Sequence, residues 1–387
     1  MTYFDKDLKR KGTSEKWSDN KQRLLFTTDN LHPMWIADME FMTVPNTLED
    51  LKNRISEGHF GYEINSDNFF DSFIDWYKKR HQWDIKKRWI NPIPSVSTAI
   101  PILIDILTNE GDGVIIQTPV YHMFSKNIKS MNRKLYKNPL IVNDQYTMDF
   151  ESLEDAMKLS KLLIIANPHN PVGRVWTYEE LIKLSNLALK YNVKVISDEI
   201  HRDILLHNKK MENLMTYSKE ISNNTITLLS PGKTFNISGQ SMAVAIITNK
   251  DIKDKFNSFI HKYHLNHNNI LNNIAFSSAY ENGSDWLDKA INYIESNLDT
   301  LKSFIASELP SINLIQGEGT YLVWLDMRKI ESDPHKLLDL ISKSGIAVDS
   351  GHWYGREGAG FIRMNIACPK AHLVKALELL KSGLDKS

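Results

Sequence analysis

The stretch LLIIANPHNPVGRVWTYEELIKLSNLALKYNVKVISDEIH (162–201) decides the fold. It begins with one apolar run of strand length, LLIIA (162–166), and a second run, VKVIS (193–197), lies near its end. Between them, leucine and isoleucine recur at helical spacing after Thr177 and Glu180, which are placed to form a capping box. Strand, helix and strand within about 35 residues are the size of a βαβ unit. The stretch therefore predicts two parallel strands joined by a covering helix.

Further apolar runs of the same kind extend this pattern from about residue 91 to residue 248. These runs are VIIQ (114–117), TITLLS (225–230) and AVAIIT (243–248). Strands that alternate with amphipathic helices predict an α/β fold with a large, doubly wound, mostly parallel sheet.

The pattern changes after about residue 285. A long amphipathic stretch, WLDKAINYIESNLDTLKSFIASEL (286–309), suits a helix that connects two domains. The rest alternates strands and helices as a smaller α+β domain does. We therefore expect an N-terminal segment over 1–50 that packs with the small domain, a large domain over 51–285, and a small domain over 286–387.

Composition excludes several classes of protein. Lys+Arg and Asp+Glu each number 47 in 387 residues, so the net charge is zero and a nucleic acid is not expected as the partner. No apolar run approaches the roughly 18 residues of a membrane helix, so no membrane association is expected. The single cysteine, Cys368, and the polar start of the chain predict a cytoplasmic protein.

Polar side chains follow three of the predicted strands. Asn170 lies in the loop after LLIIA, Asp198 comes directly after VKVIS, and Lys233 follows TITLLS. Ligands of open α/β sheets bind beyond the carboxyl ends of the strands, so these three residues should meet at one edge. Pyridoxal phosphate needs an amine for its aldehyde, a carboxylate beside its ring nitrogen and a donor for its ring oxygen. Lys233, Asp198 and Asn170 match these needs in that order.

The same cofactor also needs a phosphate site and a partner for its flat ring. Ser95 and Ser97 stand where the apolar helical pattern STAIPILIDIL begins, and a helix N-terminus suits phosphate. Ser230 could add a hydroxyl. Tyr121, which follows the run VIIQ, could stack on the ring.

Several segments with specific chemistry stand in one order along the chain. They are PMWIADMEF (33–41), HFGYE (59–63), TPVYHMF (118–124), NPHNPVGRVW (167–176), SDEIH (197–201), SPGKTFN (230–236), GHWYG (351–355) and FIRMNIACP (361–369). With these segments in this order, the chain resembles the fold-type I pyridoxal-phosphate enzymes of the aspartate aminotransferase superfamily. More narrowly, it is similar to the MalY/PatB branch of cystathionine β-lyase-like C–S lyases. The resemblance runs from about residue 30 to the C-terminus.

The resemblance implies a role for each matching residue. Three residues would be catalytic. Lys233 would form the Schiff base, Asp198 would pair with the ring nitrogen, and Tyr121 would stack on the ring face. The cofactor would also be held by further residues, which are Val96, Ser97, Asn170, His201, Ser230 and Tyr62. The resemblance assigns Arg363, Asn170 and Tyr62 to substrate binding, with Arg363 on the α-carboxylate.

The resemblance also implies a homodimer, in which Tyr62 of one subunit reaches the phosphate site of the other. Ser241 stands where many members of the superfamily have an arginine that grips the phosphate. The phosphate would therefore rely more on backbone amides, Ser230 and Tyr62.

The implied activity is α,β-elimination from L-cystathionine or another S-substituted L-cysteine, giving thiol, pyruvate and ammonia. One alternative is an aminotransferase, which would use the same cofactor residues. Another is a regulatory protein-binding role alongside lyase activity. No metal site is expected, because a helix would spread the outer histidines of HKYHLNH (261–267) apart.

Overall fold

The computed structural model describes residues 3–8, 13–143, 145–266 and 269–386. The predicted βαβ unit is present as β7 (Leu162–Ala166), α7 (Tyr178–Lys190) and β8 (Lys194–Asp198). The capping box also forms: the Thr177 side chain accepts from the backbone N–H of Glu180, whose side chain accepts from that of Thr177.

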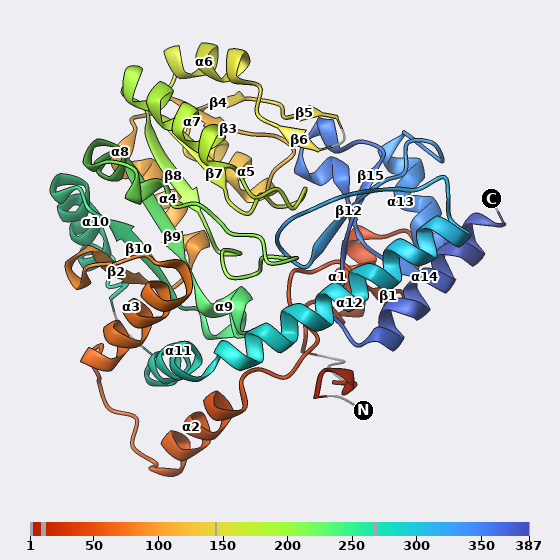
Figure 1. The fold of residues 1–387 in the computed structure, drawn as a ribbon, viewed down its shortest axis with the longest axis horizontal. Helices are drawn as coiled ribbons and strands as arrows, with labels where there is room; N and C mark the ends of the chain where they lie inside the picture. The colour runs from red at the N-terminus through yellow and green to blue at the C-terminus, as the bar shows by residue number, and fades with distance from the viewer. Residues whose placement is uncertain (1–2, 9–12, 144, 267–268, 387) are drawn as a thin grey trace.

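A seven-stranded sheet with the strand order β2-β10-β9-β8-β7-β3-β4 forms the larger half of the molecule (Figure 1). Besides β7 and β8, its strands are β2 (Ile90–Ile93), β3 (Gly113–Ile116), β4 (Lys134–Lys137), β9 (Thr225–Leu229) and β10 (Ala243–Ile247). All neighbouring pairs are parallel except the two made by β10, which runs against β2 and β9. The mostly parallel sheet predicted from the sequence is thus confirmed. Its parallel strands all end at the same edge.

Alternate side chains of one strand pack on opposite faces of this sheet. On β7, Ile164 belongs to one buried cluster, and Leu163 and Ile165 belong to another. The first cluster includes residues of α4 (Val96–Leu107), α5 (His122–Ser130) and α10 (Lys250–Lys262), and the second includes residues of α6 (Phe150–Lys158) and α7. Helices therefore cover both faces, which explains why the strands are continuous apolar runs.

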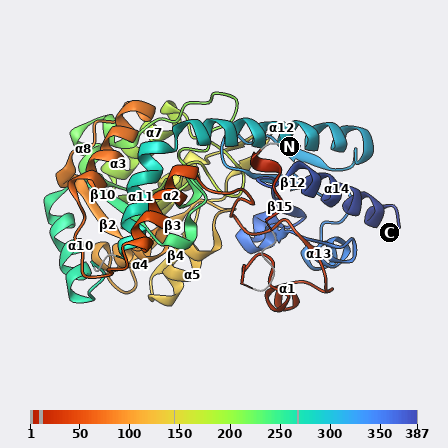
Figure 2. The same cartoon turned by 90° about the horizontal axis from the view of Figure 1, so that it is seen from below.

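The smaller half contains a four-stranded sheet in the order β11-β12-β15-β14. Its strands are β11 (Asn313–Ile315), β12 (Leu322–Asp326), β14 (Asp349–Ser350) and β15 (Phe361–Asn365), and its helices are α13 (Pro334–Lys343) and α14 (Lys370–Leu384). The predicted connecting helix is α12 (Ser284–Glu308), which extends from the larger half along the smaller one (Figures 1 and 2).

The remaining elements precede the large sheet in the chain, lie between its strands in sequence, or follow it. They are α1 (Asp19–Leu25), β1 (His32–Pro33), α2 (Pro45–Ser56), α3 (Asp67–His81), β5 (Ile141–Val142), β6 (Tyr146–Thr147), α8 (Lys219–Asn224), α9 (Pro231–Thr234), α11 (Ile270–Asn282) and β13 (Ile346–Ala347). Strand β1 pairs in parallel with β13. This pairing supports our proposal that the N-terminal segment packs with the small domain.

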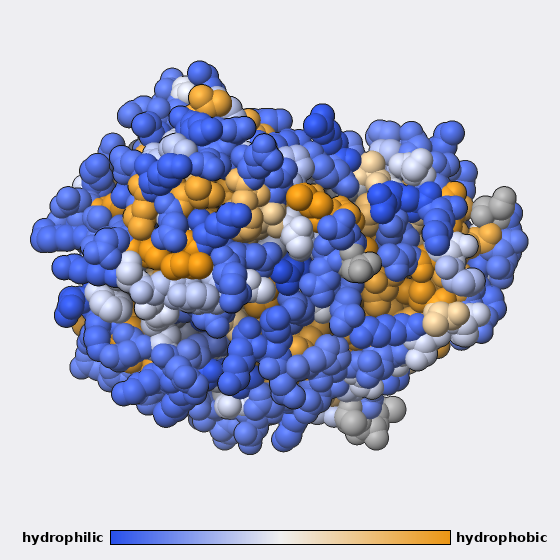
Figure 3. Space-filling model, turned by 45° about the horizontal axis from the view of Figure 1, so that its top comes forward, coloured by the Kyte–Doolittle hydropathy of each residue, from blue (hydrophilic) through white to orange (hydrophobic). Residues whose placement is uncertain are grey.

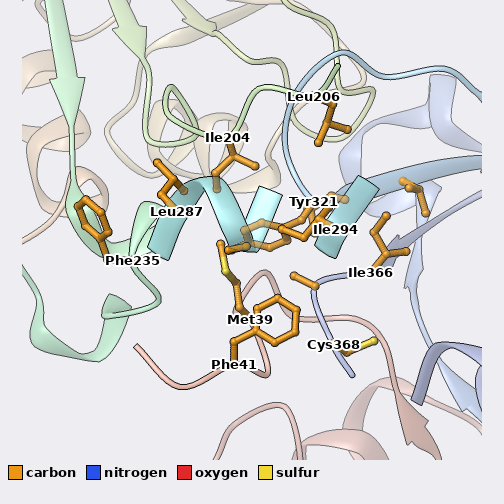
Figure 4. Packing of buried hydrophobic residues seen from close by; sticks show 14 of the residues in the cluster. Met39, Phe41, Ile204, Leu206, Phe235, Leu287, Ile294, Tyr321, Ile366 and Cys368 are labelled. Atoms are coloured by element: carbon orange, nitrogen blue, oxygen red, sulfur yellow. The ribbon is translucent and has the colours of Figure 1, made fainter. Parts of the chain in front are cut away.

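One buried cluster joins the two halves. Figure 4 shows Met39 and Phe41 of the N-terminal segment beside Leu287 and Ile294 of α12, with Tyr321 nearby. All five side chains are buried. The segment that follows β1 is therefore held between the larger and smaller halves of the molecule.

Charged and polar residues dominate the face of the molecule seen in Figure 3, where hydrophobic residues appear as separate patches. Among the described residues, no helix is both long and apolar enough to span a membrane.

Candidate active site

A cavity of about 780 Å³ lies where the carboxyl edge of the large sheet meets the smaller half of the molecule. Nine residues singled out from the sequence line it: Val96, Ser97, Tyr121, Asn170, Asp198, His201, Ser230, Lys233 and Arg363. Ser95 and Ser241 line it too. Tyr62 does not, because it lies on the surface between α2 and α3 with its side chain exposed.

Lys233 lies in the short helix α9, which begins after the N-cap residue Ser230 at the end of β9. Its Nζ donates a hydrogen bond to the carbonyl oxygen of Ala37. Burial lowers the pKa of Lys233 to about 8, although the charges of Asp38 and Asp198 oppose this shift. Lys233 is therefore an amine that loses its proton near neutral pH, as a nucleophile or general base must.

Asp198 is the last residue of β8, and its side chain is buried at the cavity. Its Oδ1 accepts from the backbone N–H of Ile200 at 3.2 Å. Burial raises the pKa of Asp198 to about 7, against the lowering effect of that hydrogen bond. A cation bound beside it would stabilise the charged carboxylate.

His201 follows Asp198 by three residues in the chain and also lines the cavity. Burial and the nearby charge of Lys233 lower its pKa to about 3, so the imidazole is neutral. Its Nδ1 is buried and has no hydrogen-bond partner among the described residues.

Helix α4 directs its N-terminus at the cavity, since Val96 and Ser97 at its start both line it. The N-cap Ser95 uses its Oγ to accept from the backbone N–H of Thr98 at 3.0 Å. The other amides of the first turn lack helical acceptors and suit an anion.

Gly232 and Ser230 also line the cavity. A Cβ added to Gly232 would lie 3.2 Å from the Ser230 Oγ and from the Cα of Ser238, so this position has little room for a side chain. The Ser230 hydroxyl donates to the carbonyl oxygen of Met242 at 2.7 Å and accepts from the Gly232 N–H at 3.1 Å.

Arg363 reaches the cavity from β15 of the small domain. Its Nη1 donates to Oδ1 of Asn170 at 3.0 Å, and its Nη2 donates to the carbonyl oxygen of Trp35 at 2.9 Å. Nη2 also forms an ion pair with Asp349. Its Nε is buried and has no hydrogen-bond partner among the described residues.

The sequence reasoning missed Asp349 and the segment 35–40. Asp349 accepts from the Tyr354 hydroxyl at 2.5 Å as well as from Arg363. The segment 35–40 contributes the carbonyl oxygens that Lys233 and Arg363 contact. The only signal was that both lie in or next to the quoted segments PMWIADMEF and GHWYG, whose individual residues suggested no chemistry.

The cavity thus gathers an amine, a buried carboxylate, a side-chain amide and a helix N-terminus. Because Arg363 occupies Oδ1 of Asn170, the amide N–H groups of that residue remain for another acceptor. Tyr121 lies on the same cavity, and burial raises its pKa, so its ring stays neutral. These residues fit the aldehyde, ring nitrogen, ring oxygen and phosphate of pyridoxal phosphate.

Among the described residues, no three His, Cys, Asp or Glu side chains gather to form a metal site. His267 of the HKYHLNH segment lies outside the described residues.

Comparison with known proteins gives one family. The family model for aminotransferase class I and II matches residues 38–380. The chain is 36% identical to the cystathionine β-lyase PatB of Bacillus subtilis, over 98% of this chain and 99% of PatB. It is 32% identical to protein MalY of Escherichia coli, over 97% of each chain. The crystal structure of cystalysin from Treponema denticola, which contains pyridoxal 5′-phosphate, matches with a TM-score of 0.94 and 34% identity over the whole of both chains.

Proposed function

The chain belongs to the aminotransferase class I and II family, and we propose that it is a pyridoxal-phosphate-dependent carbon–sulfur β-lyase. The observation that carries this proposal is that Lys233, Asp198 and Arg363 line one cavity. Full-length similarity to a cystathionine β-lyase favours elimination over transamination. The substrate is L-cystathionine or another S-substituted L-cysteine.

Pyridoxal phosphate, when bound, supplies an aldehyde that an amine can attack and a ring that accepts the electrons released at Cα. Lys233 provides the amine. Asp198 would hold the proton on the ring nitrogen, Asn170 would donate to the ring oxygen, and Tyr121 would cover the ring face. Val96, Ser97, Ser230 and His201 would complete the cofactor site. Arg363 would bind the substrate carboxylate and so orient Cα.

The Nζ of Lys233 removes the proton from Cα of the substrate. The Cβ–S bond then breaks, and its electron pair leaves with sulfur as the thiolate. Protonation of the thiolate and addition of one water balance the reaction, which yields thiol, pyruvate and ammonia. An aminotransferase would instead need a keto-acid acceptor and release no thiol.

We also propose a cytoplasmic homodimer with shared active sites. The one cysteine, Cys368, is buried, and burial raises its pKa, so nothing suggests a disulfide framework. The segment between α2 and α3 exposes the aromatic side chains of Phe60 and Tyr62. Exposed aromatic residues on an extended segment are typical of a contact between subunits.

The pH dependence of cofactor capture tests the role of Lys233. Only the neutral amine attacks an aldehyde, so the initial capture rate of the apoprotein should rise about tenfold per pH unit below pH 8 and level off above it. Stopped-flow absorbance would follow the rate, and borohydride followed by peptide mapping should place the cofactor on Lys233. Asp198→Asn is the control that separates the titration of Lys233 from that of Asp198, because Asp198 also titrates near pH 7. Label on another lysine, or a rate that still climbs at pH 10, would contradict the assignment.

Mixed dimers test the role of Tyr62. Tyr62→Ala and Lys233→Ala subunits should each be inactive alone, but exchange between them creates a dimer in which one active site has both residues. Activity should recover toward about one quarter of the wild-type value at equal mixing, since half the subunits enter mixed dimers and each has one intact site. Absence of recovery despite exchange seen by native mass spectrometry would rule out a shared site.

A further inference from the structure

Lys16 is a lysine that the proposed reaction does not use, yet it is almost completely enclosed. Its side chain is 1% exposed, and its Nζ lies 2.6 Å from Glu40 Oε1 and 3.6 Å from Asp38 Oδ1. Although burial alone would raise the pKa of Glu40, the charge of Lys16 contributes to lowering it to about 2. The buried cluster therefore holds one lysine charge between two carboxylates, and enclosing such charges is costly unless they are paired.

Lys16 holds the segment 35–40 at both of its ends. At one end, its backbone carbonyl oxygen accepts from Nε1 of Trp35 at 2.9 Å. At the other end, its ammonium group pairs with Asp38 and Glu40. One residue of the N-terminal segment thus contacts both ends of the segment 35–40.

The segment 35–40 contacts both key cations of the active site. The carbonyl oxygen of Trp35 accepts from Arg363, and that of Ala37 accepts from Lys233. The Tyr321 hydroxyl also donates to Ala37, at 3.0 Å. A displacement of this segment would therefore move the acceptors of Lys233 and Arg363 together.

We propose that Lys16 is a positioning residue of the active site: it fixes the segment 35–40 against Lys233 and Arg363, and it offsets the charge of Asp38. This inference rests on the roles proposed above for Lys233 and Arg363. The segment has other supports, because Asn365 Nδ2 donates to the carbonyl oxygens of Ile36 and Asp38 at 2.7 and 2.6 Å. Loss of Lys16 should therefore loosen the segment without unfolding it.

The electrostatic effect has a definite sign. Among the described residues, the charged groups that face Lys233 are Asp38, Asp198 and Arg363, and its titratable neighbours His201 and Tyr321 are neutral. Asp38 raises the pKa of Lys233, and Lys16 partly cancels that carboxylate. Lys16→Met removes the cancelling charge, so the pKa of Lys233 should rise. Asp38→Asn removes the carboxylate itself, so the same pKa should fall.

The test uses the full-length apoprotein, so that it does not depend on turnover. The rate at which an amine reagent modifies Lys233, followed by peptide mass spectrometry against pH, gives its pKa. We expect Lys16→Met to raise this pKa by about half a unit or more and Asp38→Asn to lower it by a similar amount. Lys16→Arg should restore most of the wild-type value. Arg23→Met is the matched control, because Arg23 lies in the same segment but pairs with Asp29 at the surface.

Kinetics of the loaded enzyme give a second readout. Lys16→Met should raise KM by about tenfold or more and lower kcat less, because displacement of Trp35 disturbs Arg363 directly. Unchanged Lys233 pKa and KM in a folded Lys16→Met variant would overturn the inference, whatever its melting temperature. If that variant does not fold, the Asp38→Asn variant is the deciding test. An unchanged or raised pKa of Lys233 in Asp38→Asn would overturn the inference. Failure of Lys233 to bind cofactor in the wild-type protein would instead refute the proposed function.

Discussion

Asp198→Ala is expected to lower kcat by about 10² to 10³ while the protein stays folded. The reason is that Asp198 is the buried carboxylate at the end of β8 and would stabilise the positive ring nitrogen of the cofactor. Without it, the ring accepts the Cα electrons poorly. Thiol release from a cysteine conjugate at saturating substrate measures this effect.

The neighbouring residue offers a matched control. Glu199 is equally buried, but its carboxylate contacts Ser197 and Arg202 and does not line the cavity. Glu199→Gln should lower the melting temperature and leave the visible spectrum of the bound cofactor unchanged. Asp198→Ala should change that spectrum. Equal kinetic losses in both variants would mean that Asp198 acts only through stability.

Arg363→Ala is expected to lower kcat/KM by about 10² to 10³, mainly through KM. Arg363 is the buried cation at the cavity that the α-carboxylate of the substrate would meet. Its loss also leaves Asp349 buried without its cation, which would repel the substrate. Arg363→Ala/Asp349→Asn removes that repulsion and should recover part of the affinity.

Arg328→Ala controls for the loss of an arginine from the same domain, since Arg328 lies at the surface beside Asp326. It should leave KM unchanged. If Arg363→Ala lowers kcat alone, with KM as in the wild type, then another group binds the carboxylate.

The large sheet was predictable because its strands are apolar runs that helices cover on both faces. Asn170, Asp198 and Lys233 were predictable as neighbours for a related reason. Parallel strands end at one edge, so residues that follow separate strands must converge there. In the structure, Ala166 lies opposite Asp198 in the sheet, and all three residues line one cavity.

The contacts of Lys16 and Asp349 were not predictable in this way. Lys16 meets Trp35 across α1 and β1, which do not fix its position relative to Trp35. Asp349 and Arg363 are cross-strand partners of β14 and β15, but β14 has only two residues and two 3₁₀ helices separate it from β15, so the sequence did not show this pairing. A buried ion pair gives no signal in the sequence until its partner is placed. The same holds for Tyr62, whose proposed target lies in another subunit.

The measurement that tests the central claim most directly is the stoichiometry of products from L-cystathionine without added keto acid. The cofactor-loaded enzyme should release thiol, pyruvate and ammonia in equal amounts over many turnovers, with its absorbance spectrum unchanged at the end. A need for a keto-acid acceptor, with conversion of the cofactor to its amine form and no thiol released, would contradict the assignment and establish an aminotransferase.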